Sequence, residues 1–475
     1  MSRTKYAGAL YACAALAFSA LLLAGCGRAG DAAPEAGSDP APAPESVNRA
    51  EDWGVYIDGR FYTPSVAVLP LTGRGVTEEE LRSALEKLPK LRRVEMRDTE
   101  LPASTRAQLR EAYPEIVFQW PVTVLGTAFL STDTQIALTG REDLTESALD
   151  ELRAAEGEFY DLRTVDLSGC PLSNETLAAL DEELGDTEVI WSFSLYGVQV
   201  STLDREIDLS GHKVTDGGAA VEAALPYCKA LEKVVMCRCG LSNEAMDELD
   251  RRHEDVRFVW MVDVKWASIR TDADFFIPFR ASGVTQSGHT VGLSALKYCP
   301  DLIALDIGHS HTQDISYVAN MRHLKYLVLA ENYTVDISAL TGLTELKWLE
   351  MFQCTCRDIS PLLTCTALED LNICYIYCSR DNLFDTLSQM TWLKRLWCSG
   401  TPMTRRQIEA LRAALPDTEI WCKAGDESTG ATWRYSESYY EMRDAFHMYY
   451  MDITGNRTRR LTEEELQKMH DRYWK

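Results

Sequence analysis

Apolar residues return at a fixed spacing in the second half of the chain. Leu302, Leu324, Leu346 and Leu368 follow one another at intervals of 22 residues, and each begins the pattern Leu-x-x-Leu-x-(Ile/Leu/Met). A fifth copy starts at Leu393, 25 residues after the fourth. The phrase Asp-Ile-Ser recurs in step with these copies, at Asp314, Asp336 and Asp358. A short apolar alternation that repeats at a fixed period predicts one strand per repeat, stacked in parallel with its neighbours.

This pattern resembles the leucine-rich repeat, and its 22-residue period with the Asp-Ile-Ser phrase resembles the repeats of internalins. The resemblance covers Leu293 to Met403 closely. It implies the α/β class: a leucine-rich-repeat solenoid with a parallel β-strand ribbon and with helices or turns on its convex side. In such repeats one inward position is usually Asn or Cys, whose side chain hydrogen-bonds loop backbone. Here that position holds Ser310, Asn332, Cys354, Ile376 and Thr401, so the turn at Ile376 is expected to be the least well satisfied.

The first half of the chain carries longer units, marked by Trp120, Trp191 and Trp260, which are separated by 71 and 69 residues. Each unit is expected to hold two leucine-rich strands and a helical arm. The strands are expected at Leu69–Leu71, Val94–Met96, Ile136–Leu138, Val165–Leu167, Ile207–Leu209, Val234–Met236 and Ile277–Phe279. The helices are expected at Thr176–Leu184 and Glu244–Arg252.

Alternating segments with a central glycine predict a short β-hairpin inserted into, and projecting from, each long unit. The glycines are Gly59, Gly126 and Gly197, and the fourth copy, near Trp266, lacks one. The N-terminal half is therefore expected to differ from the C-terminal half by these inserted β-hairpins.

The N-terminus is laid out for export. Arg3 and Lys5 precede an uncharged run from Tyr6 to Ala24, and Leu-Ala-Gly-Cys ending at Cys26 resembles the lipobox of bacterial lipoproteins. The resemblance implies a bacterial leucine-rich-repeat lipoprotein, lipidated at Cys26 and held on the extracytoplasmic face of the cell membrane. An uncleaved N-terminal anchor is the alternative.

Five segments follow from these patterns. Residues 1–25 form the signal peptide, and residues 26–50 form a Pro/Ala-rich tether with too few apolar residues to fold. Residues 51–285 hold the long units, residues 286–425 the 22-residue repeats, and residues 426–475 an aromatic tail. Because the open end of a solenoid needs cover, this tail is expected to cap it, with an aromatic binding box as the alternative. Thr462 and Glu465 form a capping box that opens a final helix.

Charge and motifs exclude several functions. Asp and Glu outnumber Lys and Arg by 72 to 48, and the formal net charge of −24 makes nucleic acid a poor partner. The chain contains no phosphate-binding GxxxxGK[ST], no HExxH and no GxSxG motif, so it is not expected to be an enzyme or to need a cofactor.

Two groups of residues could bind a metal, but the repeat register explains both. His309 and His311, with His289 nearby, flank an inward serine on a loop and need not converge, so no metal site is expected. Most cysteines fall on inward or equivalent positions, where they act as small apolar residues. Stacked neighbours such as Cys356 and Cys378 could still form a disulfide.

The residues between the leucines of each strand face the concave side, where no core needs filling. Large aromatic side chains there favour recognition, although packing on the tail is the alternative. The candidate ligand-binding residues are Tyr326, Trp348, Glu350, Phe352, Asp370, Arg395 and Trp397. The expected function is adhesion or ligand recognition, in which the chain binds a protein or a glycan. A structural scaffold of the envelope is the second reading, and a hydrolase acting on envelope material is the third.

Overall fold

The computed structural model describes residues 54–99, 101–264, 267–277, 292–422 and 433–448, with shorter stretches between 450 and 468. The chain divides into two compact units, and the first ends at Val66 but also takes in Thr77–Lys90. Within it, β1 (Val55–Ile57) and β2 (Arg60–Tyr62) form an antiparallel hairpin, followed by helix α1 (Glu78–Lys87). Thr77 caps this helix in a capping box with Glu80.

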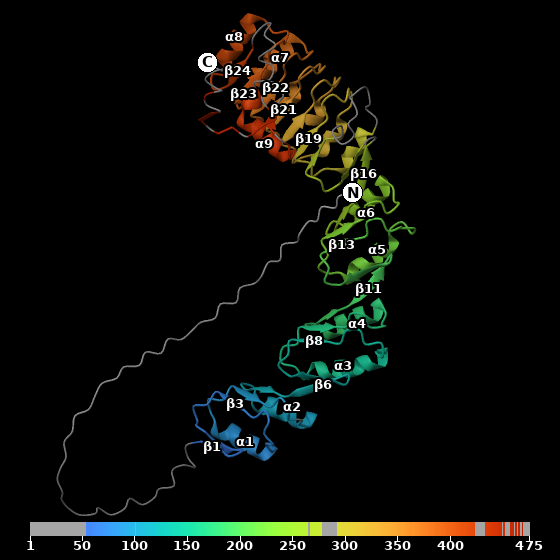
Figure 1. Ribbon diagram of the computed structural model, residues 1–475, viewed down its shortest axis with the longest axis vertical. Helices are drawn as coiled ribbons and strands as arrows, with labels where there is room; N and C mark the ends of the chain where they lie inside the picture. Colours follow the sequence, from blue (N-terminus) through green and yellow to red (C-terminus); the bar gives the residue numbers. More distant parts are fainter. Residues whose placement is uncertain are drawn as a thin grey trace, which may run out of the picture. The chain divides into compact units, whose positions relative to one another are not determined.

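The second unit begins with three parallel sheets of three strands each, every strand beside the next one along the chain (Figure 1). The strands are β3 (Val68–Pro70), β4 (Arg93–Glu95) and β5 (Val117–Gln119); β8 (Gln135–Ala137), β9 (Thr164–Asp166) and β10 (Glu188–Ile190); and β13 (Glu206–Asp208), β14 (Lys233–Val235) and β15 (Arg257–Val259). The two strands expected in each unit are confirmed to within one residue. The third strand of each sheet, which ends directly before Trp120, Trp191 or Trp260, was not predicted.

Helices connect these strands. They are α2 (Ala103–Ala112), α3 (Leu149–Glu156), α4 (Asn174–Leu184), α5 (Ala219–Ala224) and α6 (Asn243–Arg252). The expected helices in α4 and α6 are therefore confirmed. Ser173 and Ser242 cap them by accepting a hydrogen bond from a first-turn backbone N–H.

A β-hairpin follows each three-stranded sheet, as expected. The pairs are β6 (Pro121–Val124) with β7 (Thr127–Leu130), β11 (Ser192–Leu195) with β12 (Val198–Ser201), and β16 (Met261–Val264) with β17 (Ala267–Arg270). In the first two, both turn residues have positive φ, for example 50° at Leu125 and 75° at Gly126, which suits the twist of a two-residue hairpin. The turn of the third, Lys265 and Trp266, lies outside the described residues.

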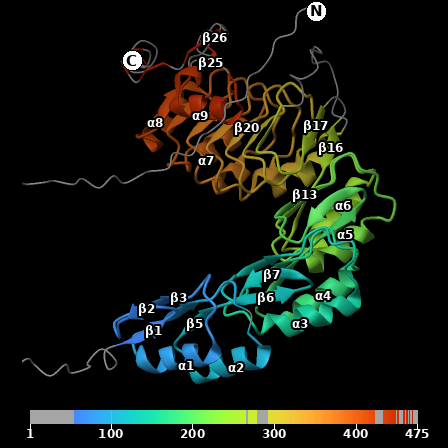
Figure 2. The same ribbon diagram turned by 60° about the horizontal axis from the view of Figure 1, so that its bottom comes forward.

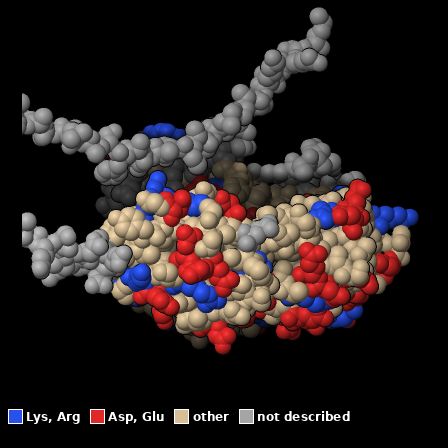
Figure 3. Space-filling model, turned by 90° about the horizontal axis from the view of Figure 1, so that it is seen from below, with Lys and Arg blue, Asp and Glu red and all other residues tan. Residues whose placement is uncertain are grey.

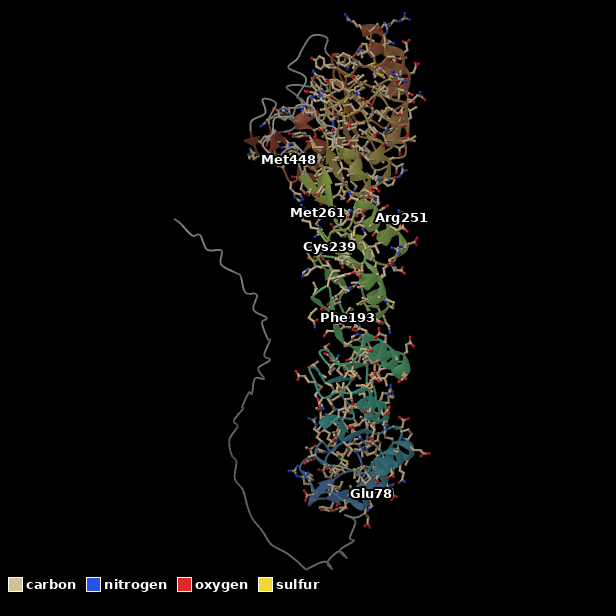
Figure 4. The ribbon with its side chains drawn as sticks, turned by 90° about the vertical axis from the view of Figure 1, so that its right-hand side faces the viewer. Glu78, Phe193, Cys239, Arg251, Met261 and Met448 are labelled. Atoms are coloured by element: carbon tan, nitrogen blue, oxygen red, sulfur yellow. The ribbon has the colours of Figure 1, made fainter. Side chains whose placement is uncertain are left out.

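These hairpins do not project from the units, which corrects the expectation. Val124, Val200, Val262 and Val264 are at most 2% exposed, and the last three belong to the core that continues into the following repeats. Phe193 and Met261, which Figure 4 labels, come from the second and third hairpins. Each hairpin therefore helps to join the apolar core of one unit to that of the next.

The second half forms one parallel ribbon of seven strands in chain order (Figure 1). They are β18 (Phe275–Phe276), β19 (Ala304–Asp306), β20 (Tyr326–Val328), β21 (Trp348–Glu350), β22 (Asp370–Asn372), β23 (Arg395–Trp397) and β24 (Glu419–Trp421). Short 3₁₀ turns and the helices α7 (Arg380–Leu387) and α8 (Arg405–Ala414) connect them. The leucines at the strand centres are fully buried, so the leucine-rich-repeat solenoid is confirmed.

The inward polar position behaves as expected. Asn332 is fully buried and makes three hydrogen bonds: its Nδ2 donates to the carbonyls of Ile307 and Leu329, and its Oδ1 accepts from the Thr312 N–H, each at 2.9 Å. The side chains of Ser310, Cys354 and Thr401 also donate to backbone carbonyls. Ile376 cannot, because its side chain is apolar.

One strand lies in a different register from the expectation. The first ribbon strand is Phe275–Phe276, not Ile277–Phe279. Phe276 pairs with Leu305 and is buried in the leucine core, whereas Ile277 packs on the opposite side of the ribbon. A shift by one residue exchanges the two faces of a strand, so the expected assignment was wrong for this copy.

A repeated contact links tryptophan to the first residue of the preceding helix. The indole N–H of Trp191 donates to Asn174 at 3.1 Å, and that of Trp260 donates to Asn243 at 3.0 Å. The same position before Trp120 holds Ala103, and among the described residues the indole N–H of Trp120 has no hydrogen-bond partner. The first long unit therefore lacks a hydrogen bond that the next two possess.

We expect Ala103→Asn to raise the free energy of unfolding by about 1 kcal/mol, because the new amide oxygen would pair a buried N–H. Urea unfolding of the variant and the parent protein measures the change. Ala103→Leu is the control, since it adds bulk without an acceptor. An equal gain from both substitutions would show that the hydrogen bond is not the cause.

Candidate functional site on the strand face and the loop edge

The face of the seven-stranded ribbon that points away from the leucine core, here called the strand face, carries the predicted site residues. Tyr326, Trp348, Asp370 and Arg395 stand in register on neighbouring strands and form one row across it. Glu350 and Trp397 belong to the adjacent row, and Phe352 follows β21. The structure therefore brings the predicted residues together on one face, as the repeat register implied.

These side chains are not exposed, which corrects the expectation of an open aromatic surface. Residues 433–448, here called the C-terminal segment, lie over the strand face and include helix α9 (Glu437–Ala445) (Figure 2). Trp348 and Trp397 are 0% exposed and Tyr326 is 7% exposed. Tyr439 packs on Trp348 and Trp433 packs on Phe352, with ring centroids 6.1 and 6.2 Å apart. Of the two alternatives for these aromatics, the structure realises packing on the tail.

The C-terminal segment is shaped for this position. Ser436 caps α9, and the helix buries Tyr439, Tyr440 and Met442 in the apolar cluster shared with the strand face. Phe446 joins that cluster, and Met448, labelled in Figure 4, ends the segment. The described part of the tail thus covers the strand face of the ribbon, whereas the sequence predicted a cap over its end.

Polar contacts fix the segment in place. The Arg395 guanidinium donates to Asp370 at 2.7 Å and to the Ser438 hydroxyl at 3.1 Å, and that hydroxyl donates to the other Asp370 oxygen. Burial raises the pKa of Asp370, and the Arg395 charge and the hydrogen bonds oppose this rise. On a neighbouring strand the Tyr326 hydroxyl donates to Glu441 at 3.1 Å. Strand and helix therefore share a network of charged and hydroxyl groups.

Glu350 lies in the second row of the strand face. Burial raises its pKa to about 7, the nearby Asp306 carboxylate adds to the rise, and the Arg434 guanidinium opposes it. Because the pKa in the folded state lies above the ordinary value of 4.5, the folded protein holds a proton that the unfolded chain has lost. The free energy of unfolding should therefore fall as the pH rises from the ordinary pKa of 4.5 to the folded-state pKa of about 7.

We expect Glu350→Gln to stabilise the protein by up to about 3 kcal/mol at about pH 8 and by much less at about pH 5. The amide stays neutral at both values, so the penalty of burying a carboxylate disappears. Urea unfolding at both pH values gives the comparison. Glu409→Gln, at an exposed position of α8, is the control and should show no such difference. Equal effects of Glu350→Gln at the two pH values would contradict the prediction.

A second candidate surface lies at the loop edge, where strands β19 to β23 end. His311, Tyr333, Thr355 and Tyr377 follow one another at 22-residue intervals there. Tyr333 is 51% exposed and Tyr377 is 70% exposed. The His311 ring stacks on Tyr333, with centroids 5.4 Å apart. These tyrosines were not among the predicted site residues, although their common register position was a signal in the sequence.

Each exposed tyrosine borders a hollow. The hollow at Tyr333 has a volume of about 560 Å³ and the hollow at Tyr377 about 570 Å³, within the range of small-ligand sites. Among the described residues, the first is lined chiefly by His311, Thr312, Gln313, Asp314, Tyr317 and Tyr333. The second is lined chiefly by Arg357, Tyr375, Tyr377, Ser379, Gly400 and Pro402.

The hollow at Tyr333 contains a polar atom that lacks a partner. Within the part of the chain that the structure describes, the buried His311 Nδ1 has no hydrogen-bond partner. Unpaired buried polar groups destabilise a fold unless water or a ligand pairs them. This hollow therefore offers hydrogen bonding as well as an aromatic surface.

The remaining candidates give no site. Among the described residues, no group of three or more His, Cys, Asp or Glu side chains is placed to hold a metal ion. His309 instead lies 3.0 Å from Glu331, and His289 is outside the described residues. Figure 3 shows acidic side chains spread over the face in view, with basic side chains between them.

The N-terminal predictions concern residues outside the described ranges. Cys26 and the segments 1–25 and 26–50 belong to this part of the sequence. In the described part of the chain, no helix has the length and apolar character needed to cross a membrane. The hydrogen bonds of the capping box between Thr462 and Glu465 are present.

Comparison with known proteins finds solved leucine-rich-repeat structures. No family model matches the chain, and no curated protein is similar to it in sequence. Internalin C2 of Listeria monocytogenes is 16% identical with a TM-score of 0.26, over 49% of this chain and 87% of that one. An internalin F of the same organism is 16% identical with a TM-score of 0.26, over 78% and 86%. A leucine-rich-repeat protein of Leptospira interrogans is 14% identical with a TM-score of 0.23, over 75% and 96%. The assignment of a leucine-rich-repeat fold rests on the chain's own strand register, with one buried leucine-centred strand per repeat.

Proposed function

We propose that this chain is an exported, lipid-anchored binding protein that recognises its partner at the loop edge of its repeats. The observation that carries the proposal is the pair of exposed tyrosines, Tyr333 and Tyr377, each beside a hollow of ligand size. Large exposed aromatic rings are energetically useful mainly when a partner covers them. The strand face cannot take this role while the C-terminal segment occupies it.

The chemistry of the loop edge favours a hydroxyl-rich ligand, and hence a glycan over a protein. Flat aromatic rings stack on the apolar faces of sugar rings. The side chains of Thr312, Gln313 and Asp314 supply donors and acceptors for hydroxyl groups. Tyr333 and Tyr377 stand two repeats apart, which is about 10 Å at the spacing of parallel strands. One extended chain of sugars could therefore contact both rings.

Export and lipid anchoring rest on the sequence. The charged start, the apolar run and Cys26 support a lipoprotein on the outer side of the cell membrane. A Cys26→Ser variant expressed in the source cell should leave the membrane fraction, because the lipid provides the affinity. Retention of this variant with the membranes would favour an uncleaved apolar anchor.

The binding proposal is tested with the full chain on immobilised oligosaccharides and, in parallel, on labelled surface proteins of the source cell. A Tyr333→Ala/Tyr377→Ala variant removes both rings. The matched control is Tyr56→Ala, which removes a tyrosine 65% exposed in the first unit. We expect oligosaccharide binding that the double variant loses and the control keeps. Binding that survives in the double variant would exclude the loop edge, and capture of surface proteins alone would replace the glycan by a protein partner.

A structural scaffold of the envelope is the second candidate. The occupation of the strand face by the chain's own C-terminal segment favours it, because that face is then part of the core. A scaffold should bind no oligosaccharide, and its deletion should weaken the envelope. A third possibility, hydrolysis of envelope material, would require the purified chain to turn over peptide or glycan substrates.

A further inference from the structure

Cys398 and Cys422 stand beside each other on the last two strands of the ribbon. Each is the residue that follows its strand, and the preceding residues, Trp397 and Trp421, are paired in register. The Cys398 N–H donates to the Trp421 carbonyl at 2.8 Å, so the pairing continues up to these cysteines. Neighbouring parallel strands lie about 4.8 Å apart, and a disulfide requires Cα atoms about 4.4–6.8 Å apart. The backbone therefore places the two residues within disulfide range.

The Cys422 thiol also contacts Cys398. Its sulfur donates to the backbone carbonyl of Cys398 at 3.4 Å. Cys398 is fully buried, whereas Cys422 is partly exposed. The hydrogen bond from Cys398 lowers the pKa of Cys422, burial opposes this, and the Arg412 guanidinium adds to the lowering. Partial exposure beside a cation and a second thiol is the environment of a reactive cysteine.

A second pair in the same ribbon provides a contrast. Cys356 and Cys378 also follow paired residues, Thr355 and Tyr377. Their thiols point to other partners, because the Cys356 sulfur donates to the Asp358 carbonyl and the Cys378 sulfur donates to the Arg357 carbonyl. Burial raises the pKa of both. In the first pair one thiol therefore donates to the other cysteine, whereas in the second pair both thiols donate to residues outside the pair.

We propose that Cys398 and Cys422 are an oxidisable dithiol that forms a disulfide by exchange with a small-molecule or protein disulfide. The Cys422 thiolate attacks one sulfur of that disulfide, forms a mixed disulfide and releases a thiolate. Cys398 loses its proton, and its sulfur attacks the Cys422 sulfur and expels the second thiolate. In sum, two protein thiols become a disulfide, and the oxidant disulfide is reduced to two thiols.

The disulfide would join the last strand of the ribbon to the strand before it. Terminal repeats have a neighbour on one side only and are the least supported part of a solenoid. Cys422 also begins the connection to the C-terminal segment, which starts at residue 433. The cross-link would therefore hold both the last repeat and the point from which the covering segment departs. An exported protein meets an oxidising compartment, which suits such a bond, although the exchange itself does not depend on the proposed export.

The test incubates the reduced full chain with oxidised glutathione, alkylates the remaining thiols and analyses the peptides by mass spectrometry. We expect one cross-linked peptide pair containing Cys398 and Cys422, lighter by two hydrogens. The oxidised protein should melt about 5 °C higher than the reduced protein. Cys398→Ala should leave Cys422 as a glutathione adduct, with no cross-link and no such rise.

Cys356→Ser/Cys378→Ser is the matched control and should form the Cys398–Cys422 cross-link like the parent. Three results would overturn the proposal: no cross-link in the parent protein, a glutathione adduct of Cys422 that does not resolve, or a cross-link between Cys356 and Cys378 instead. Because the parent protein alone decides these outcomes, the test holds even if a variant folds poorly. Glycan binding plays no part in the measurement, so it can fail or succeed independently of the proposed function.

Discussion

Replacing Trp348 with Ala should lower the free energy of unfolding by about 3–5 kcal/mol, the usual range for removing a large buried aromatic side chain. Trp348 is the first residue of β21 and is fully buried under the C-terminal segment. Its ring lies 6.1 Å from both Trp397 and Tyr439, so the substitution opens a cavity at the centre of this contact. Urea unfolding followed by circular dichroism measures the loss.

Trp348→Phe is the control for this prediction. Among the described residues the Trp348 indole N–H has no hydrogen-bond partner, so phenylalanine sacrifices no hydrogen bond there and should recover most of the stability. If Trp348→Ala instead melted like the parent protein and only lost a ligand, the side chain would have to be exposed. The strand face would then be open, as the sequence suggested.

The second large effect is expected for Arg395→Ala, which should destabilise the protein by about 3–5 kcal/mol, since it leaves a buried carboxylate without its partner. The Asp370 side chain is 0% exposed, and Arg395 donates both to it and to Ser438 of the C-terminal segment. The variant should also loosen that segment. Limited proteolysis should therefore cut near residues 433–448 sooner than in the parent.

A double variant separates the charge from the packing. Asp370→Asn/Arg395→Met removes both charges and keeps much of the volume, so it should recover a large part of the lost stability. If Arg395→Ala were as stable as the parent and its C-terminal segment were cut no faster, the ion pair between Asp370 and Arg395 would not be what holds the segment on the strand face. The same assay reports how firmly the segment blocks the predicted ligand-binding residues.

The position of the C-terminal segment changes where recognition is sought. The aromatic residues Tyr326, Trp348 and Trp397 have partners within the chain, so their size serves packing. The exposed tyrosines at the loop edge have no such cover, and Tyr377 is the most exposed large apolar side chain among the described residues. A mutational search for a ligand should therefore begin at Tyr333 and Tyr377, and the strand face becomes relevant only if the segment leaves it.

Sequence alone determined the features that repeat. The leucine period set the strand order, the inward position identified Asn332 and its neighbours, and glycine marked the hairpin turns at Gly59, Gly126 and Gly197. These features are local: each depends on residues within one repeat and on the two-residue period of a strand. The one register error was at Ile277. There the neighbouring residues Phe276 and Ile277 are both apolar, so the sequence does not show which of them points into the leucine core.

Only the tertiary structure decided which surfaces stay open. Tyr326 and Glu441 are 115 residues apart in sequence, and Asp370 and Ser438 are 68 apart, yet each pair is hydrogen-bonded. No periodicity relates the C-terminal segment to the strands it covers, because a single amphipathic helix can bury its apolar side on many surfaces. The sequence marked Trp348 and Trp397 as aromatic residues facing away from the leucine core. Whether such residues bind a partner or join a second core depends on contacts between distant segments, and these are set by the folded chain.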